Sequence, residues 1–487
     1  MSIVPPSLPD NNMDARTPAA AESAPVDIIA ANKNADPYVL DPSKVMEPPK
    51  GWAASLRFFG PGMVATAGIV GSGELITTTT LGSRAGMTLL WLILVSTIVK
   101  VAVQIELARW SISTGKPGIF GYDHVPPKIG KRSWASYLVL LQFVQFLANL
   151  GGIVGSAAVA MSMLLPFGGD PFSAVSIGIW AWIFTIIVIA IHQLNRYSLI
   201  ETVSTGLVLL VTIAVIVMVF GIQATQFAWT AGDLADGMRF QVSAGAMGIA
   251  LSMFGLTGVN ANEISGYTFW VVEKGYATWT GPNDGSDDWV RRARGWISVM
   301  KKDAWVSWFV YTLATVAFYI LGATVLYKQG ISPTGTDLIE TISHIFTDTL
   351  GPWVGPLFLL LSAITLAKTL FTAVPNLSRQ FTASLAVFGL FDWADAKRRN
   401  LVLRILMVIL PLCWGLTATL IQQPLQLVIL AGILQAVYLM IIAIATVYLS
   451  FTETDKRIKD GSPTTVYLLI SAVAIFAVGV LALADAF

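Results

Sequence analysis

Residues 60–83 read GPGMVATAGIVGSGELITTTTLGS, an apolar stretch long enough to cross a bilayer but interrupted in its middle by Gly71, Ser72 and Gly73. A glycine costs about 1 kcal/mol relative to alanine inside a helix, so two glycines and a serine in three positions make local unwinding cheap. Unwound backbone at membrane depth persists only where it is buried in protein or lines a cavity. The stretch therefore predicts a membrane helix that is broken at the border of a site.

A second interrupted span lies in the other half of the chain. Residues 252–267 read SMFGLTGVNANEISGY, in which Gly255 and Gly258 flank Thr257. The polar residues that follow are Asn260, Asn262 and Glu263. Broken helices in corresponding positions of two halves indicate an inverted-repeat transporter that holds its substrate between the breaks. Glycine pairs also let helices pack closely, but two matching breaks that each precede a carboxylate favour the transporter.

The composition is that of a membrane protein. Of 487 residues, 55% are hydrophobic and 12% are charged, whereas soluble domains carry about 25% charged residues. A net charge of +1 gives no electrostatic footprint for nucleic acid. One cysteine, Cys413, and three scattered histidines argue against a disulfide or a soft-metal centre. We find no P-loop and no nucleophile elbow, so we expect neither an enzyme, nor an ATP-driven pump, nor a bound cofactor.

Apolar stretches predict eleven membrane helices. They lie at 53–82, 87–112, 134–165, 171–192, 198–222, 242–272, 303–327, 353–375, 400–421, 424–450 and 464–486. Residues 1–50 are rich in Pro, Ala, Asp and Asn and are predicted to form a disordered cytoplasmic tail. The transmembrane domain, 51–487, is predicted to contain a first repeat at 51–225, a second repeat at 240–450 and an extra helix at 460–487. The fold class is thus an all-α integral membrane protein.

Basic residues alternate between the loops. They gather after the second, sixth, eighth and tenth predicted spans, at Lys116, Lys128, Lys131, Arg132, Arg291, Arg292, Arg294, Lys301, Lys302, Lys397, Arg398, Arg399, Lys456, Arg457 and Lys459. Because cytoplasmic loops carry the excess of Lys and Arg, the N-terminus is predicted inside the cell and the C-terminus outside, in the cell (inner) membrane. The loop at 274–302 mixes acidic residues with the arginines and is predicted to be a solvated cytoplasmic loop rather than a regulatory site.

Four charged side chains fall deep inside predicted spans. A carboxylate there costs several kcal/mol unless it is paired, protonated or bound to metal. Glu74 follows the first break and Glu263 the second, and each is a candidate ligand; Glu74 is alternatively a buried helix cap. Lys368 in the eighth span and Lys100 in the second are candidates either to replace a coupling cation or to pair with a carboxylate. These two readings of the lysines stay open.

Several segments resemble the Nramp family of divalent-metal transporters, which have the LeuT-type fold. Gly60-Pro61-Gly62 stands before the first break and Leu81-Gly82-Ser83 after it, in Nramp-like spacing. The second span ends QIELARWSISTGK, similar to the family's segment ending in ATGK, and Asp303 begins the seventh span. The resemblance covers nearly all of residues 55–450. It implies a 5+5 inverted repeat with helices 1 and 6 unwound.

The chain departs from Nramp where that family binds metal. The family's Asp and Asn of a DPGN break correspond to Gly71 and Glu74, and its MPH segment corresponds to Gly258, Val259 and Asn260. The family's third helix carries acidic residues linked to proton transfer, where this chain has Asn149 and Gly152. We therefore expect a divergent branch with weak or no proton coupling.

The candidate ligands are all oxygen donors. They are Glu74, Glu263, Asn260, Asn262, Thr257 and backbone carbonyls near Gly71 and Thr257, with Gly258 beside them. Such a set suits a hard cation such as magnesium or manganese, moved by alternating access. Outside the breaks, Glu106 and Arg109 are expected to organise a cytoplasmic gate, and Gln435 and Tyr438 to contact the site from the tenth span.

Two other functions were weighed. A small organic solute, an amino acid or an amine, fits the exposed backbone of the breaks, with Lys368 in place of a sodium ion and Trp270, Tyr267 and Phe254 as pocket walls. A receptor or scaffold without transport is disfavoured by a tail of about fifty residues and the lack of a C-terminal domain. The partners expected are thus the transported ion or solute and the lipid bilayer, with a monomeric chain.

Overall fold

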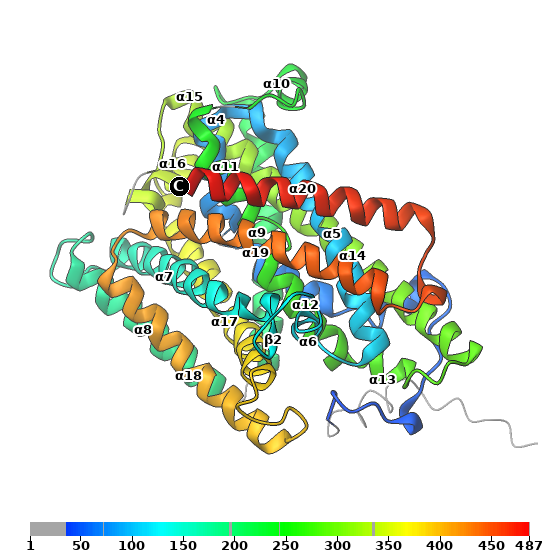
Figure 1. Ribbon diagram of the computed structural model, residues 1–487. Coiled ribbons are helices and arrows are strands. Elements are labelled where there is room, and N and C mark those ends of the chain that lie inside the picture. The colour runs from blue at the N-terminus through cyan, green and yellow to red at the C-terminus, as the bar shows by residue number, and fades with distance from the viewer. Residues whose placement is uncertain (1–35, 72, 194–196, 243, 334–336, 487) are drawn as a thin grey trace, which may run out of the picture.

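The computed structural model describes residues 36–71, 73–193, 197–242, 244–333 and 337–486, and it is almost entirely helical (Figure 1). Eight helices of this part are long and apolar enough to cross a membrane. Two broken spans and α9 complete the eleven predicted. The unbroken spans are α5 (Leu90–Thr114), α7 (Leu138–Leu164), α8 (Ala174–Gln193), α9 (Tyr197–Gly221), α14 (Asp287–Leu321), α17 (Val354–Val387), α18 (Ala396–Leu420), α19 (Pro424–Thr452) and α20 (Ser462–Ala486).

Both predicted breaks are present. The first span consists of α3 (Pro61–Ile69), a π-helical stretch (Gly73–Thr78) and α4 (Thr79–Ala85). The sixth consists of α11 (Met247–Leu256) and α12 (Ala261–Lys274). Each half-helix is too short to cross a bilayer alone, since about 20 residues are needed, so the two halves of each span must act together.

Short elements connect the spans. These are α2 (Trp52–Leu56), α6 (Gly118–Tyr122), α10 (Ala231–Gly237), α13 (Tyr276–Thr280), α15 (Tyr327–Gln329), α16 (Leu338–Leu350) and an antiparallel pair of strands, β1 (Lys128–Ile129) and β2 (Arg132–Ser133). In Figure 1, α10, α15 and α16 lie toward the end of the bundle that holds the C-terminus. The helices α6 and α13 lie toward the opposite end, near the blue N-terminal segment.

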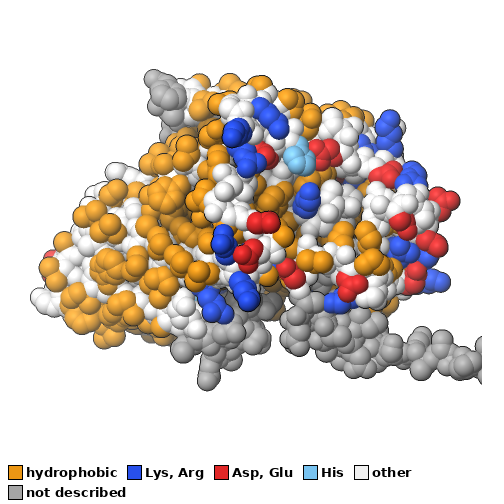
Figure 2. All heavy atoms as spheres, turned by 60° about the horizontal axis from the view of Figure 1, so that its bottom comes forward, with side chains coloured by type: hydrophobic (Ala, Val, Ile, Leu, Met, Phe, Trp, Pro, Cys, Tyr) orange, Lys and Arg blue, Asp and Glu red, His pale blue; other side chains and the backbone are white. Residues whose placement is uncertain are grey.

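The core and the lipid-facing surface are carried by different helices. Large aromatic side chains of α14 are fully buried, among them Trp289, Trp296 and Tyr319. The helices α8 and α18 instead expose rows of apolar side chains, such as Ile186 and Leu416. Figure 2 shows one face of the surface, where charged side chains gather on one side and hydrophobic ones cover the other. Large exposed apolar surfaces mark contact with a membrane or another protein, and the length and apolarity of these helices favour the membrane.

Small residues bring the broken spans close to their neighbours. A Cβ atom at Gly255 of α11 would lie 1.9 Å from the carbonyl oxygen of Gly432 of α19, and one at Gly82 of α4 would lie 2.5 Å from that of Tyr319. Gly255 therefore allows α11 and α19 to pack closely, which is the alternative explanation given above for the glycine pairs. Gly258 differs, because its φ of +67° is a left-handed conformation that the break itself requires.

Two predicted boundaries are wrong in detail. The region 274–302, expected to be a solvated loop, contains α13 and the first turns of α14, which begins at Asp287 because Ser286 caps it. Of the predicted tail, residues 1–35 lie outside the described part. Residues 36–50 are not disordered: Tyr38 packs edge-on against Trp393, and the indole of Trp296 donates a hydrogen bond to the carbonyl of Met46. Apolar and aromatic partners on the domain hold this segment.

Candidate functional site

The first break exposes backbone groups that side chains then satisfy. The helix α3 ends at Ile69, and Val70 adopts an extended conformation. A Cβ at Gly71 would lie 2.3 Å from the hydroxyl of Thr369, so only glycine fits there without a shift. Helical structure resumes at Gly73 as a π-helix, a form that is rare and often marks functional sites.

The Glu74 side chain forms its hydrogen bonds next to the first break. It is fully buried, and its carboxylate accepts hydrogen bonds from the Gly71 amide at 3.3 Å and from the Thr315 hydroxyl at 3.2 Å. A carboxylate in the first turn of a helix is also favoured by the helix dipole. The contacts around Glu74 are therefore those of a cap that faces α14.

The second break is organised by Asn260. Thr257 is extended, Gly258 takes its left-handed turn, and the Asn260 side chain then caps α12 by accepting a hydrogen bond from the Glu263 amide at 3.1 Å. The hydroxyls of Thr78 and Thr257 lie 3.2 Å apart. The two breaks thus touch each other directly.

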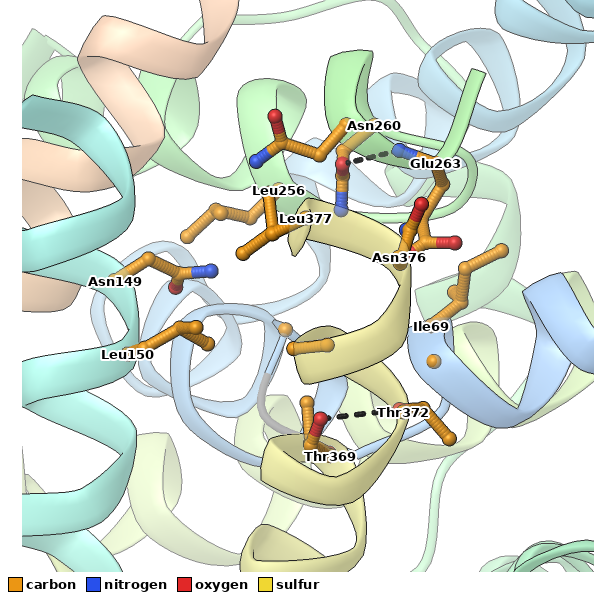
Figure 3. Close-up of a pocket in the computed structure, with 14 residues that line it drawn as sticks. Ile69, Asn149, Leu150, Leu256, Asn260, Glu263, Thr369, Thr372, Asn376 and Leu377 are labelled. Carbon is orange, nitrogen blue, oxygen red and sulfur yellow. Dashed lines mark hydrogen bonds between the residues drawn. The ribbon is translucent and has the colours of Figure 1, made fainter. Parts of the chain in front are cut away.

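A small polar cavity lies beside the breaks (Figure 3). Its volume is about 40 Å³. Its lining comes from α3, the π-helical stretch, α7, α11, α12 with its N-cap, and α17. The lining residues are Gly68, Ile69, Gly73, Asn149, Leu150, Leu256, Asn260, Asn262, Glu263, Thr369, Thr372, Ala373, Asn376 and Leu377. Among these residues Glu263 is the single charged side chain. Glu74, Thr257 and Gly258 do not line the cavity.

Glu263 and Asn149 give the cavity its chemical character. One oxygen of Glu263 accepts a hydrogen bond from the Asn376 amide at 3.2 Å. The side-chain oxygen of Asn149 is buried without a hydrogen-bond partner in the described structure. Figure 3 shows the Asn149 side chain extending from α7 toward the cavity with its amide nitrogen, not this oxygen, foremost. Buried polar atoms are rarely left unpaired, so Asn149 at the edge of the cavity has hydrogen-bonding capacity that no described residue uses.

Buried amides surround the cavity and connect three helices. Gln142 of α7 donates to Asn262 at 3.0 Å and to Gln380 of α17 at 2.6 Å, and Asn262 donates to Gln145 at 2.8 Å. Gln380 donates in turn to Asn376 at 2.8 Å. These groups are neutral, so the network orients the site without adding charge. On the far side, the Gln435 amide of α19 lies 2.8 Å from the Asn260 side chain.

The lysines bind backbone carbonyls at the breaks. The Lys368 ammonium donates to the Val70 carbonyl at 2.6 Å. The Lys100 ammonium donates to the Thr257 carbonyl at 2.5 Å and also to the Phe254 carbonyl. Both lysines are buried, and within the described residues neither forms an ion pair. Lys368 still interacts electrostatically with Glu74 and Glu263.

The remaining candidates lie away from the cavity. Arg109 pairs with Glu106 at 3.0 Å and also with Asp460, which ties α5 to the loop before α20. Burial raises the pKa of Asp460, but hydrogen bonds from Lys301 and Arg109 outweigh this effect and lower the pKa overall. Tyr438 lines a separate cavity of about 10 Å³.

Ion pairs join the helices next to the cavity. Arg379 follows Asn376 by one turn of α17 and pairs with Glu273 of α12 at 2.6 Å. Tyr38, from the N-terminal segment, donates a hydrogen bond to the same carboxylate at 2.5 Å. Arg399 of α18 pairs with Asp36 at 2.8 Å. The segment that precedes the first span therefore bridges α12 and α18.

Six polar residues in or around the cavity were not among the candidates predicted from the sequence. The missed residues are Gln142, Gln145, Thr369, Thr372, Asn376 and Gln380. A signal was present, because polar residues recur every three or four positions on α7 and on α17, which are otherwise apolar. Such spacing places side chains on one face of a helix.

No group of three or more His, Cys, Asp and Glu side chains that could hold a metal is found in the described residues. A cation site would thus rest on one carboxylate and neutral oxygens. Magnesium accepts such a set, since it binds through one or two carboxylates and keeps several waters.

The fold is shared with solved transporters. A mutant of the manganese transporter of Eremococcus coleocola superposes with a TM-score of 0.62 at 15% identity, covering 91% of this chain and 90% of that one. MhsT in complex with L-phenylalanine has a TM-score of 0.55 at 16% identity, covering 90% of this chain and all of that one. A mostly helical chain with these neighbours has the LeuT-type fold.

Sequence relatives agree with the structural ones. The divalent metal cation transporter MntH of Mycobacterium tuberculosis is 24% identical over 80% of this chain and 85% of its own length. The MntH proteins of Acidiphilium cryptum (30% identical) and Granulibacter bethesdensis (25% identical) match over 23% and 43% of this chain, and the matches span only 26% and 44% of those proteins. The family profile described as natural resistance-associated macrophage protein-like matches residues 62–485. The chain therefore belongs to the Nramp family of membrane transporters.

Proposed function

We propose that this protein is a secondary transporter of a hard divalent cation, magnesium or manganese, which binds in the cavity beside Glu263. The observation that carries the proposal is a cavity in which one carboxylate, that of Glu263, stands among neutral amide and hydroxyl side chains. Relatives named as divalent metal cation and manganese transporters support the substrate class. Oxygen ligands favour hard cations.

The size of the cavity favours an ion over an organic solute. A water molecule needs about 10–15 Å³, so about 40 Å³ accommodates an ion with one or two waters. An amino acid would require the cavity to open much further. The second candidate, a small organic solute, retains one supporting observation: the two ammonium groups already cover break carbonyls that a metal could otherwise bind.

The proposal assigns Glu263 as the charged ligand, with Asn149, Asn260, Thr369 and Thr372 as neutral donors. In this proposal Glu74 is not a ligand but a buried cap of the helix that follows the first break. Because α7 contains no acidic residue, we further propose that transport is weakly coupled to protons or not at all.

We propose the membrane orientation that the distribution of Lys and Arg among the loops predicts. The N-terminus lies in the cytoplasm, the C-terminus lies outside the cell membrane, and the repeats at 51–225 and 240–450 rock about the breaks. Figure 1 is compatible with this arrangement, because the N-terminal segment and the C-terminus lie toward opposite ends of the bundle.

The test is flux into proteoliposomes. Wild type should take up Mn²⁺ or Mg²⁺ with saturation, and Glu263→Gln should lose most of this flux. A matched control is Glu273→Gln, which removes a carboxylate from the same helix outside the cavity. Saturable amino-acid or amine uptake without divalent flux would replace the proposal by the organic-solute function. Acidification of the vesicle lumen in step with metal entry would refute weak proton coupling.

A further inference from the structure

Each broken span ends its first half in the same way. A helix leaves its last four carbonyl groups without helical partners, and its C-terminus carries a partial negative charge of about half a unit. In the first span the Val70 carbonyl is such a group, and in the sixth span the Phe254 and Thr257 carbonyls are. In a membrane interior these groups attract a cation.

The chain supplies that cation itself at both places. Lys368 donates to Val70, and Lys100 donates to Phe254 and Thr257, with distances of 2.6 Å for Val70 and 2.5 Å for Thr257. Lys368 is 3% exposed and Lys100 is 0% exposed, so water does not solvate either ammonium. A lysine ammonium is a compact point charge with three donors, which suits a cluster of carbonyls.

Each lysine belongs to one half of the sequence and contacts the broken span of the other half. Lys100 lies on α5 in the first half and holds the sixth span, whereas Lys368 lies on α17 in the second half and holds the first span. The carboxylates complete the balance of charge, because Glu74 and Glu263 each stand in the first turn after a break. Lys100 interacts electrostatically with Glu74, and Lys368 interacts with both.

We propose that Lys100 and Lys368 are built-in cations that occupy the two sites where a transporter with broken helices would bind a free monovalent coupling ion. In such transporters, unwound carbonyls and the C-terminal ends of half-helices hold sodium ions or protons. Here tethered ammonium groups fill both positions. The breaks are therefore assembled without a monovalent ion, and the substrate moves without one.

The proposal does not depend on which substrate is carried. It predicts that removing one ammonium creates a cation site, since the carbonyls and the facing carboxylate remain. Lys368→Ala should leave room for a small cation beside Val70, whereas Lys368→Met should fill the same space without charge. The two variants lose the same positive charge and differ in the room that they leave.

The experiment measures thermal unfolding of the purified protein in sodium, lithium, methylammonium or choline chloride at equal ionic strength. Lys368→Ala should unfold several degrees below wild type and regain at least half of the loss in sodium, lithium or methylammonium, but not in choline, which is too large. Lys368→Met should regain nothing. Lys100→Ala should behave like Lys368→Ala. The control is Lys328→Ala, because Lys328 donates to the Ala228 carbonyl at 2.7 Å on the exposed surface; its unfolding should not depend on the cation.

The proposal would be overturned if the unfolding temperature of Lys368→Ala recovered equally in choline. It would also be overturned if none of the four salts restored that temperature. Measurements on the wild-type protein test the proposal even if the variants do not fold. Its unfolding temperature and its Mn²⁺ binding should be the same in sodium and in choline. A specific rise of either in sodium would show that a free coupling ion binds and would also overturn the proposal. Absence of Mn²⁺ binding in both salts would count against the proposed substrate alone.

Discussion

Glu74 and Glu263 occupy equivalent places in the two broken spans but differ in what surrounds them. Each carboxylate stands in the first turn after a break. Glu74 faces Thr315 of α14 and the amide of Gly71, and it lies outside the cavity. Glu263 faces Asn376 of α17 and lines the cavity.

The difference follows from the helices that pack on each break. On the Glu74 side, α14 is packed tightly: a Cβ at Gly322, in the turn that continues α14, would lie 2.3 Å from the Thr79 carbonyl. On the Glu263 side, α7 and α17 present polar side chains that do not fill the space. A break in a helix thus becomes a candidate binding site only where its neighbours leave room and donors.

The largest expected effect is on substrate affinity at Glu263. Glu263→Gln should raise the KM for Mn²⁺ uptake by about 10- to 100-fold, because one charged interaction is worth about 1.5–3 kcal/mol. The amide retains the shape of the side chain, so the unfolding temperature should change little. Uptake kinetics in proteoliposomes measure the effect, and an unchanged KM would remove Glu263 from the site.

Asn149 should come next. Asn149→Leu removes an oxygen that has no protein partner, so it should lower Mn²⁺ affinity by about tenfold. Thermal stability should be unchanged or higher, because an unsatisfied buried polar atom is lost. Calorimetric titration with thermal unfolding checks both halves. A clear loss of stability with unchanged affinity would show that Asn149 is structural.

Glu74 should show the opposite pattern. Glu74→Gln weakens the hydrogen bonds to Gly71 and Thr315 and should cost about 1–2 kcal/mol of stability. Affinity for Mn²⁺ should stay within about threefold, since that factor corresponds to less than 1 kcal/mol. Thermal unfolding beside uptake kinetics tests this. A large rise in KM with normal stability would move the substrate from Glu263 to Glu74.

The smallest effect should come from the contact between the breaks. Thr78→Val and Thr257→Val each remove one hydroxyl of a pair 3.2 Å apart. A double-mutant cycle on stability should give a coupling of about 0.5–1 kcal/mol. Purely additive losses would mean that the two breaks are held together by other contacts.

Much of the fold could be predicted from the sequence because its signals are local. Apolar stretches predicted the eleven spans, and Gly71, Gly73 and Gly258 predicted the breaks. Local signals cannot tell which neighbour packs on a break, so Glu74 and Glu263 looked alike. The tail prediction was wrong for residues 36–50 for the same reason, since Tyr38 and Asp36 are held by distant residues, Glu273 and Arg399.

Only some of the residues that line the cavity could be predicted from the sequence. Asn260, Asn262 and Glu263 were candidate ligands, and Asn149 was a candidate only for coupling or an ion pair. All four line one cavity. Thr369, Thr372 and Asn376 were not predicted, because their spacing on α17 places them on one helix face but does not show what that face packs against. Thr257 and Gly258 shape the backbone of the break and do not line the cavity.

The most direct test of the central claim is the position of the bound ion. Anomalous scattering from crystals grown with Mn²⁺ would locate the metal without assuming any role for a residue. The account predicts one strong peak within coordination distance of Glu263 and Asn149, between α7, α12 and α17. A peak beside Glu74, against α14, would contradict it.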